Sequence, residues 1–250
     1  MMPNSPDQGR DEDRHIVEVA NHGLEPDLDA GSSAVGKSKK RHARTDGFTS
    51  KDVLDLLVFI INLVLVFTLL RVFVVGAYRI PSGSMEDTIE IGDRVITNRL
   101  APKVMPLRRG DVVVFKDPAN WLKSTDSFGS NDLIKRLIGL PGDTVACKGK
   151  GSPVTINGVA IDESSYIRKG TQPSDFAFSV KVTEGNVFVL GDNRANSSDS
   201  RYHPDDGNNG LVPISRVRGV AFLTIAPIKH FGILHSHHDV FTAIPGAEHS

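Results

Sequence analysis

The chain has 250 residues, of which 39% are hydrophobic and 24% charged, and its formal net charge is −1. This length is enough for one or two domains with a substantial core. The near-neutral charge gives no support to a nucleic-acid-binding protein, whose binding domains are strongly basic. There is a single cysteine, Cys147, which excludes an intramolecular disulfide. Its place in a short apolar run predicts a small buried residue on a strand.

Residues 1–51 are predicted to form a disordered cytoplasmic tail. They are rich in small, polar and charged residues and have no sustained apolar periodicity. The charge is divided along this tail, with a net charge of −6 over residues 1–36 and +5 over residues 37–51. An asymmetry of this kind is typical of tails and membrane-flanking segments.

A nucleotide-binding pattern occurs inside the tail, at residues 31–38 (GSSAVGKS). Such a loop binds phosphates only where a buried strand leads into it and a helix follows. The residues before it contain Pro26 and several acids, and residues 39–45 after it form a basic run without an apolar face. We therefore interpret the pattern as accidental and expect no nucleotide to bind.

Residues 52–76 are predicted to be a transmembrane anchor helix. The run from Leu56 to Leu70 is apolar except for Asn62 and Thr68, and about 20 such residues span a bilayer. Arg71 is near enough to the end to reach the headgroups. A buried core helix is the alternative, but this run is apolar on every face. The basic flank places residues 1–51 in the cytoplasm and the chain beyond the helix on the extracytoplasmic side.

Residues 77–228 are predicted to form a β-rich domain, and residues 229–250 a loose C-terminal tail. Short runs rich in Val, Ile and Phe alternate with Gly, Pro and Asp, which is typical of strands joined by tight turns. The expected strands are residues 94–97, 111–115, 133–138, 144–146, 154–156, 176–182, 186–190 and 217–225. The fold class is therefore mostly β, with one N-terminal transmembrane helix.

Three segments of this domain carry candidate chemistry. The first is residues 80–88 (IPSGSMEDT), close to the predicted membrane surface, where a simple turn is the alternative interpretation. The second is residues 133–143, in which Lys135 lies in an apolar strand. Desolvation there would lower the lysine pKa, and a neutral amine can take a proton from a serine hydroxyl. The third is the polar loop of residues 191–201 (GDNRANSSDSR), which is suited to orienting a catalytic group.

In this order, the three segments resemble the bacterial type I signal peptidases, or leader peptidases, which are Ser-Lys proteases. The matching motifs are Ser-x-Ser-Met after the anchor, Lys-Arg before Gly-x-Pro-Gly-Asp, and Gly-Asp-Asn…Ser-x-Asp-Ser-Arg. The resemblance covers roughly residues 56–225 and implies an extracytoplasmic, antiparallel β-sheet catalytic domain of the signal peptidase type. It implies that Ser84 is the nucleophile and Lys135 the general base.

The same resemblance implies further roles. Ser82 would donate to the oxyanion beside the backbone N–H of Ser84, and Ser197 would orient the Lys135 amine. The remaining supporting residues would be Asp199 and Arg201, which would form an ion pair that holds the loop, and Arg136, which could join that pair. The substrate-binding residues would be Ile80, Pro81, Met85 and Ile134. Two positions depart from the family pattern: Asp87 stands where proline is usual, and Leu133 stands where an aromatic residue is common.

The implied function is a membrane-anchored serine endopeptidase that removes signal peptides from secretory preproteins by acyl transfer. Its substrates would carry small residues at the third and first positions before the cut, and no metal or cofactor would be needed. A Ser-His-Asp triad using His203 is the nearest chemical rival. A non-catalytic β-domain that binds exported peptides or cell-wall partners is another alternative. The histidines His235, His237 and His238 could bind a metal ion weakly, but we expect them to belong to a solvated tail.

Overall fold

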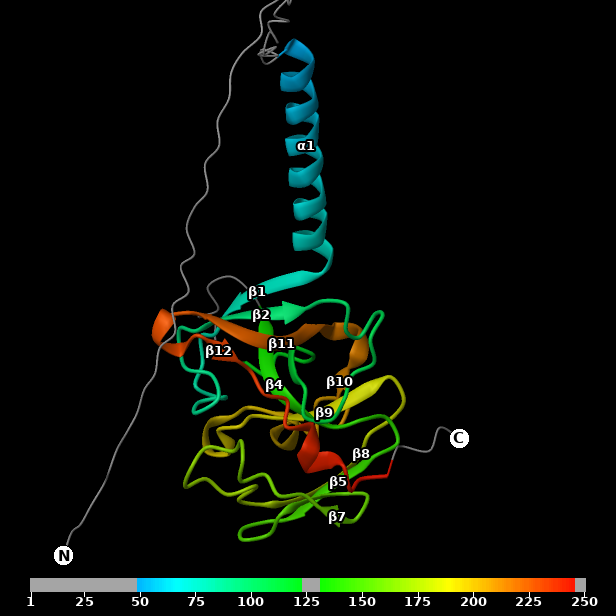
Figure 1. Ribbon diagram of the computed structural model, residues 1–250. Coiled ribbons are helices and arrows are strands. Elements are labelled where there is room, and N and C mark those ends of the chain that lie inside the picture. The colour runs from blue at the N-terminus through cyan, green and yellow to red at the C-terminus, as the bar shows by residue number, and fades with distance from the viewer. Residues whose placement is uncertain (1–48, 123–130, 246–250) are drawn as a thin grey trace, which may run out of the picture. The chain divides into compact units, whose positions relative to one another are not determined.

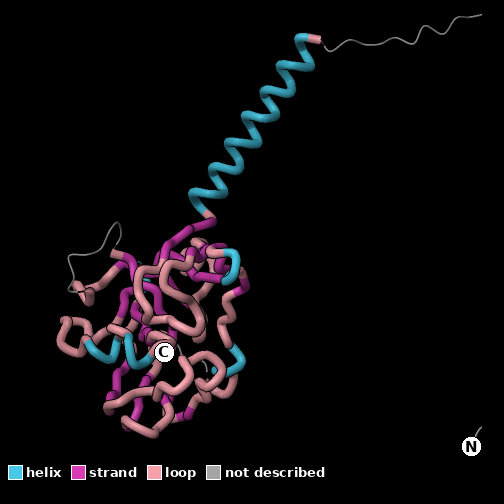
Figure 2. Tube along the Cα trace, turned by 90° about the vertical axis from the view of Figure 1, so that its left-hand side faces the viewer, coloured by secondary structure: helices cyan, strands magenta, loops and turns pink. Residues whose placement is uncertain are grey.

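One long helix opens the part of the chain that the structure describes. The computed structural model describes residues 49–122 and 131–245, so the nucleotide-binding pattern and nearly all of the predicted tail lie outside the described residues. Helix α1 spans Ser50–Phe73. It begins with a capping box, in which the Thr49 side chain accepts from the Asp52 N–H and the Asp52 carboxylate accepts from the Thr49 N–H. Figure 2 shows α1 as the one long helix of the described residues.

Helix α1 is apolar on all sides and buries none of its surface. Its segment Ser50–Arg71 has 22 residues and a mean hydropathy of 2.8. At 1.5 Å per residue this is a length of about 33 Å, which matches a hydrocarbon core of about 30 Å. Asn62 and Thr68 donate to the carbonyls of Val58 and Val64 at 2.8 and 2.7 Å, so their polar groups are satisfied within the helix. The predicted apolar helix is therefore present.

The remaining described chain is mainly β-structure in two sheets, and every strand pairing described is antiparallel. The larger sheet has the order β1-β2-β11-β3-β4-β9-β10, with β12 also pairing with β11. Its strands are β1 (Val75–Arg79), β2 (Arg94–Asn98), β3 (Val112–Lys116), β4 (Asp132–Gly139), β9 (Asn186–Leu190), β10 (Val212–Pro213), β11 (Val217–Ala226) and β12 (Gly232–Ile233).

The smaller sheet has the order β7-β6-β5-β8. Its strands are β5 (Thr144–Lys148), β6 (Val154–Ile156), β7 (Val159–Ala160) and β8 (Ala177–Lys181). In Figure 1 this sheet lies at the opposite end of the domain from β1, β2 and β11. Cys147 lies on β5 and is buried, as predicted. The mostly β fold class with one N-terminal apolar helix is confirmed.

Strands β3 and β4 bury side chains on both of their faces. Along β3, Val113 and Phe115 enter one apolar cluster, whereas Val112 and Val114 enter another. Strand β4 is buried along its length from Leu133 to Gly139. A strand buried on both faces takes its charged residues out of water. The two charged residues at the centre of β4 must therefore find partners inside the protein.

The structure differs from the sequence-based expectation at two boundaries. Helix α1 ends at Phe73, and β1 begins at Val75, inside the segment assigned to the anchor. Strand β1 pairs residue for residue with β2, from Val75 opposite Asn98 to Arg79 opposite Arg94. The apolar run continues through residues 72–75, so hydrophobicity alone did not mark the change from helix to strand.

The segment after Lys229 was expected to be a loose tail, but its described part packs on the domain. Strand β12 pairs with β11, and the side chains of Leu234, Phe241 and Ile244 are buried. Phe241 and Ile244 join the cluster that contains Ile138 and Val145. These few apolar residues are too widely spaced to form a sequence pattern, although each fills a site in the core.

Candidate active site

Ser84 lies in a tight turn that directly follows β1, and the residue after it is buried in the core. Its neighbour Met85 is fully buried, and Ile89 closes the turn by donating its N–H to the Met85 carbonyl at 2.7 Å. The Ser84 carbonyl accepts the backbone N–H of Asn193 at 3.1 Å, and the Asn193 amide donates to the Gly83 carbonyl at 2.9 Å. The turn is therefore fixed to the loop that follows β9.

Lys135 lies at the centre of β4 and meets Ser84 directly. Its Nζ is 2.6 Å from Ser84 Oγ, and the two side chains are buried, at 2% and 4% exposed. The residues are 51 positions apart in the sequence, so the fold alone brings them together. This is the closest polar contact of the Ser84 hydroxyl within the described residues.

The environment of Lys135 lowers its pKa to about 8, from an ordinary value of 10.5. Burial is the main cause, because it removes the hydration that stabilises the ammonium form. The carboxylates of Asp199 and Asp192 act in the opposite direction and raise the pKa part of the way back. About a tenth of the amine is therefore uncharged at pH 7, far more than for an ordinary lysine, and the uncharged form is the one that can take a proton from a hydroxyl.

Two hydrogen-bond donors lie close to the Ser84 hydroxyl. Ser82 Oγ is 3.5 Å from Ser84 Oγ, close to the nucleophilic oxygen. The backbone N–H of Ser84 has no acceptor among the described residues. A free N–H and a hydroxyl beside a nucleophile are the donors that an oxyanion hole needs.

Gly191 allows the third predicted segment to approach the nucleophile. A Cβ atom at this position would collide with Ser197 Oγ and would lie 2.5 Å from the Ser84 carbonyl oxygen. Ser197 and Ser84 therefore pack against the same bare Cα. The Ser197 hydroxyl is buried and helps to lower the pKa of Asp199, and no hydrogen bond from it to Lys135 is described.

Asp199 and Arg201 form the predicted ion pair. The guanidinium donates to both carboxylate oxygens at 2.9 Å, and both side chains are buried. Burial raises the pKa of Asp199, but Arg201 outweighs this effect, so the pKa of the carboxyl is lower than usual. Asp199 also accepts the N–H of Gly191 at 3.1 Å, which fixes the loop beside Ser84.

Arg136 pairs with Asp192 and not with the Asp199–Arg201 pair. Its guanidinium donates to both oxygens of Asp192 at 2.9 and 2.7 Å, with both side chains fully buried. It also donates to the backbone carbonyls of Gly110, His235 and Ser236. Strand alternation sends the neighbours Lys135 and Arg136 to opposite faces of β4. Lys135 on one face contacts Ser84, and Arg136 on the other face binds residues that are distant in the sequence.

The predicted substrate-binding residues separate into two groups. Ile80, Pro81 and Ile134 line one small pocket of about 30 Å³, together with Ser82 and Leu133. Met85 lies elsewhere, fully buried in the core beneath the nucleophile, where its sulfur accepts the N–H of Asp192 at 3.4 Å. The structure thus brings three of the four residues together in a pocket that Ser82, the neighbour of the Ser84 hydroxyl, also lines.

The backbone at Asp87 accounts for its departure from the family pattern. Its φ is +73°, in the left-handed region, whereas a proline ring holds φ near −65°. Aspartate tolerates this conformation better than most residues. The Asp87 carboxylate also accepts the N–H of Lys169 at 3.2 Å. In this chain the turn after the nucleophile therefore has a shape that proline cannot adopt.

Several supporting residues were missed by the sequence-based interpretation. Arg194 forms a buried ion pair with Glu163, and Arg168 binds Glu86 at 2.6 Å next to the nucleophile turn. Glu163 and Arg168 lie in an irregular segment between β7 and β8 that carries no recognisable motif. Asn193 belongs to a motif that the sequence did indicate, but its contact with Gly83 depends on tertiary structure.

The histidines proposed for rival functions have other contacts. His203 stacks on Trp121 with ring centroids 4.5 Å apart, and its Nε2 is 2.8 Å from Ser198 Oγ. His238 Nε2 is 2.9 Å from Asp111. No cluster of three or more metal-binding side chains occurs within residues 49–122 and 131–245.

A buried serine hydroxyl in contact with a buried, partly neutral lysine amine is the arrangement of a serine hydrolase with a lysine base. The comparisons with known proteins agree with this class. The family model described as "Signal peptidase, peptidase S26" matches residues 53–226.

Two named relatives support the same assignment, and one solved structure is also similar in sequence. The signal peptidase I of Mycobacterium tuberculosis strain H37Rv is 31% identical, over 88% of this chain and 87% of its own. The signal peptidase I of Leptolyngbya laminosa is 39% identical, over 66% and 75%. A crystal structure of a signal peptidase I from Enterococcus faecalis V583 is 33% identical, covering 46% of this chain and 95% of its own, with a TM-score of 0.34.

The chain therefore belongs to the peptidase S26 family of signal peptidases, and its activity is the removal of signal peptides by a serine protease. With its one N-terminal apolar helix, it is a membrane-anchored protein. These findings favour the peptidase over a non-catalytic β-domain.

Proposed function

We propose that Ser84 and Lys135 are the catalytic dyad of this signal peptidase and that they act on the extracytoplasmic side of the membrane. The buried contact of 2.6 Å between Lys135 Nζ and Ser84 Oγ is the observation that carries the proposal. The basic residues before α1 support a cytoplasmic N-terminus, since positive charge is retained on the cytoplasmic side.

The first half of the reaction forms an acyl-enzyme. Neutral Lys135 takes the proton of Ser84 as the serine oxygen attacks the scissile carbonyl carbon. The carbonyl oxygen becomes an oxyanion, which accepts hydrogen bonds from the Ser84 N–H and the Ser82 hydroxyl. The intermediate collapses as the Lys135 ammonium protonates the departing amine, which is the new N-terminus of the mature protein.

The second half releases the signal peptide. Lys135, again neutral, takes a proton from water as the water oxygen attacks the ester carbonyl of the acyl-enzyme. The second tetrahedral intermediate collapses, the proton returns to Ser84 Oγ, and the signal peptide leaves with a free carboxylate. The dyad is then restored, with no net gain or loss of protons by the enzyme.

We further propose that the pocket beside the dyad selects small side chains. Its volume is small, at about 30 Å³, and its walls include Ile80 and Ile134. A large side chain would have to displace buried core residues. This size supports substrates with small residues at the third and first positions before the cut.

The test of the dyad is cleavage of a preprotein by the full chain in lipid. Ser84→Ala and Lys135→Ala should each abolish detectable turnover, and Ser82→Ala should reduce the rate by about 100- to 1,000-fold. The matched controls are Ser164→Ala and Lys181→Ala, because both side chains are exposed away from the dyad. Near-normal turnover by either dyad variant would refute the assignment.

A further inference from the structure

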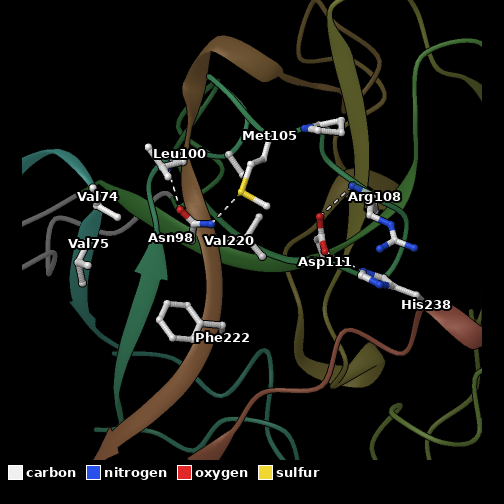
Figure 3. Close-up of a pocket in the computed structure, with 12 residues that line it drawn as sticks. Val74, Val75, Asn98, Leu100, Met105, Arg108, Asp111, Val220, Phe222 and His238 are labelled. Atoms are coloured by element: carbon white, nitrogen blue, oxygen red, sulfur yellow. Dashed lines mark hydrogen bonds and ion pairs between the residues drawn. The ribbon is translucent and has the colours of Figure 1, made fainter. Parts of the chain in front are cut away.

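A second pocket lies next to the end of the membrane helix, and it shares no residue with the pocket beside the dyad. Its volume is about 440 Å³, within the range of small-molecule sites. It is formed where β1, β2 and β11 meet the loop of residues 100–108 (Figure 3). Nothing in the proposed reaction uses it.

The pocket begins at the membrane boundary. Val74 is the C-cap residue of α1, and Val75 is the first residue of β1, and both line the pocket. Since α1 is apolar up to Phe73, these two valines stand where the chain leaves the hydrocarbon region. The pocket therefore lies directly beside the end of the apolar helix.

The floor of the pocket is apolar and remains partly open. Its apolar residues include Leu100, Met105, Val220 and Phe222, and Met105 and Phe222 are 48% and 42% exposed. Asn98 is the polar side chain among them. It is already satisfied, since its oxygen accepts the Leu100 N–H at 2.9 Å and its amide contacts the Met105 sulfur at 3.4 Å. This floor therefore offers a ligand mainly apolar contact.

The far end of the pocket is polar and carries an exposed cation. Figure 3 shows Val74 and Val75 at one end and Arg108 and His238 at the other. The carboxylate of Asp111 is also there, but its oxygens already accept from the Arg108 N–H at 2.8 Å and contact His238 Nε2 at 2.9 Å. The Arg108 side chain is exposed, so the charge presented to a ligand at this end is positive.

We propose that this pocket binds one anionic phospholipid of the surrounding bilayer. One acyl chain lies on the floor and leads back past Val74 and Val75 into the hydrocarbon region. The phosphate lies at the far end, against Arg108. Apolar burial supplies the affinity, and the arginine supplies the preference for a negatively charged headgroup.

The test uses the full chain in nanodiscs that contain equal amounts of phosphatidylglycerol and phosphatidylcholine. After gentle release into detergent, native mass spectrometry counts the lipids that each protein molecule retains. The intact chain should retain one phosphatidylglycerol. Val220→Trp fills the pocket and Phe222→Glu places a charge on its floor, and each should lower the retained lipid at least tenfold.

Two matched controls distinguish lipid binding in the pocket from non-specific lipid binding elsewhere on the protein. Ile228→Trp alters an apolar side chain that is 89% exposed and outside the pocket, and it should retain lipid normally. Arg108→Gln should remove the preference for phosphatidylglycerol, whereas Lys181→Gln should keep it. Preprotein cleavage reports folding in every variant, because none of these residues touches the dyad.

Three results would overturn the proposal. Val220→Trp and Phe222→Glu could retain as much lipid as Ile228→Trp. The intact chain could retain both lipids equally. A photo-crosslinking preprotein could attach its apolar stretch to residues of this pocket, which would make the pocket part of the substrate site.

Discussion

At the scale of single residues, the Lys135 amine is under two opposing influences. Burial lowers its pKa, and the carboxylates of Asp199 and Asp192 prevent the pKa from falling further than about 8. The proposed dyad therefore contains an amine whose pKa is close to physiological pH. A lysine at the surface of the same strand would be almost fully protonated there.

This pKa predicts the pH dependence of catalysis. Because only neutral Lys135 accepts the serine proton, kcat/KM should fall about tenfold per pH unit below pH 8 and level off above it. The measurement is peptide cleavage between pH 6 and 10, with unfolding followed by circular dichroism to show that the enzyme stays folded. A rate that is constant from pH 6 to 8 would contradict a lysine base.

Gly191 provides a second residue-scale prediction. Gly191→Ala should lower the cleavage rate at least tenfold and destabilise the fold by roughly 1–3 kcal/mol, because its Cβ would push Ser197 and Ser84 apart. Gly232→Ala is the matched control, since no atom lies within 4 Å of its added Cβ. Thermal unfolding and preprotein cleavage measure the two effects. Equal behaviour of the two variants would show that the close approach at Gly191 is unimportant.

At the scale of elements, β4 joins the active site to the C-terminal segment. Lys135 faces Ser84, and Arg136 holds Asp192 and the carbonyls of His235 and Ser236. These carbonyls are placed there because Phe241 and Ile244 are buried a few residues further along. The stability of the C-terminal segment therefore supports the strand that carries the base.

Truncation of Phe241 tests this dependence. Phe241→Ala should cost about 3–5 kcal/mol of unfolding free energy, because it leaves a cavity in the core. Phe231→Ala should change it by less than about 0.5 kcal/mol, since Phe231 is 65% exposed. Urea unfolding of the two variants gives the comparison. If both were equally stable, the C-terminal segment would not be part of the core.

The elements that the sequence predicted are those with dense local signals. The apolar anchor helix is present, and the eight expected strands correspond to β2, β3, β4, β5, β6, β8, β9 and β11. Each of these strands is marked in the sequence by a short stretch rich in apolar residues. Four strands were missed: β1 continues the apolar run of the helix, and β7, β10 and β12 are only two residues long. Their strand character comes from pairing with neighbouring strands, which is a tertiary effect.

In the candidate site, too, the residues within local motifs could be predicted and their distant partners could not. Ser84, Lys135 and the Asp199–Arg201 pair lie within recognisable motifs. In contrast, Asp192 as the partner of Arg136, and Glu163 as the partner of Arg194, join residues 56 and 31 positions apart. Every one of these charges has to be neutralised once the strands are buried. Which carboxylate does so depends on the packing of loops that have no periodic pattern.

At the scale of the whole molecule, the proposed orientation in the membrane rests on the distribution of charge along the sequence. Residues 37–51 carry a net charge of +5 just before α1, whereas the chain after residue 77 is nearly neutral. This imbalance is the basis for the proposed cytoplasmic N-terminus. The neutral domain alone would favour neither side.

The single cysteine makes this orientation easy to test. Cys147 is buried and should react little with maleimides in the folded protein. In intact cells, a membrane-impermeant maleimide should label Lys181→Cys but should label Ser5→Cys only after the membrane is opened. Labelling of both variants in intact cells, or of Ser5→Cys alone, would contradict the proposed orientation.

The hydrogen bonds from Arg136 to the carbonyls of His235 and Ser236 also have a consequence for how the protease folds during its synthesis. The ribosome makes the chain from its N-terminus, so the proposed base Lys135 is synthesised about a hundred residues before the segment whose carbonyls bind Arg136. Until residues 235 and 236 dock, the Arg136 guanidinium lacks two of its hydrogen-bond acceptors. The newly made enzyme should therefore reach full activity only after residues 235–244 have packed on the domain.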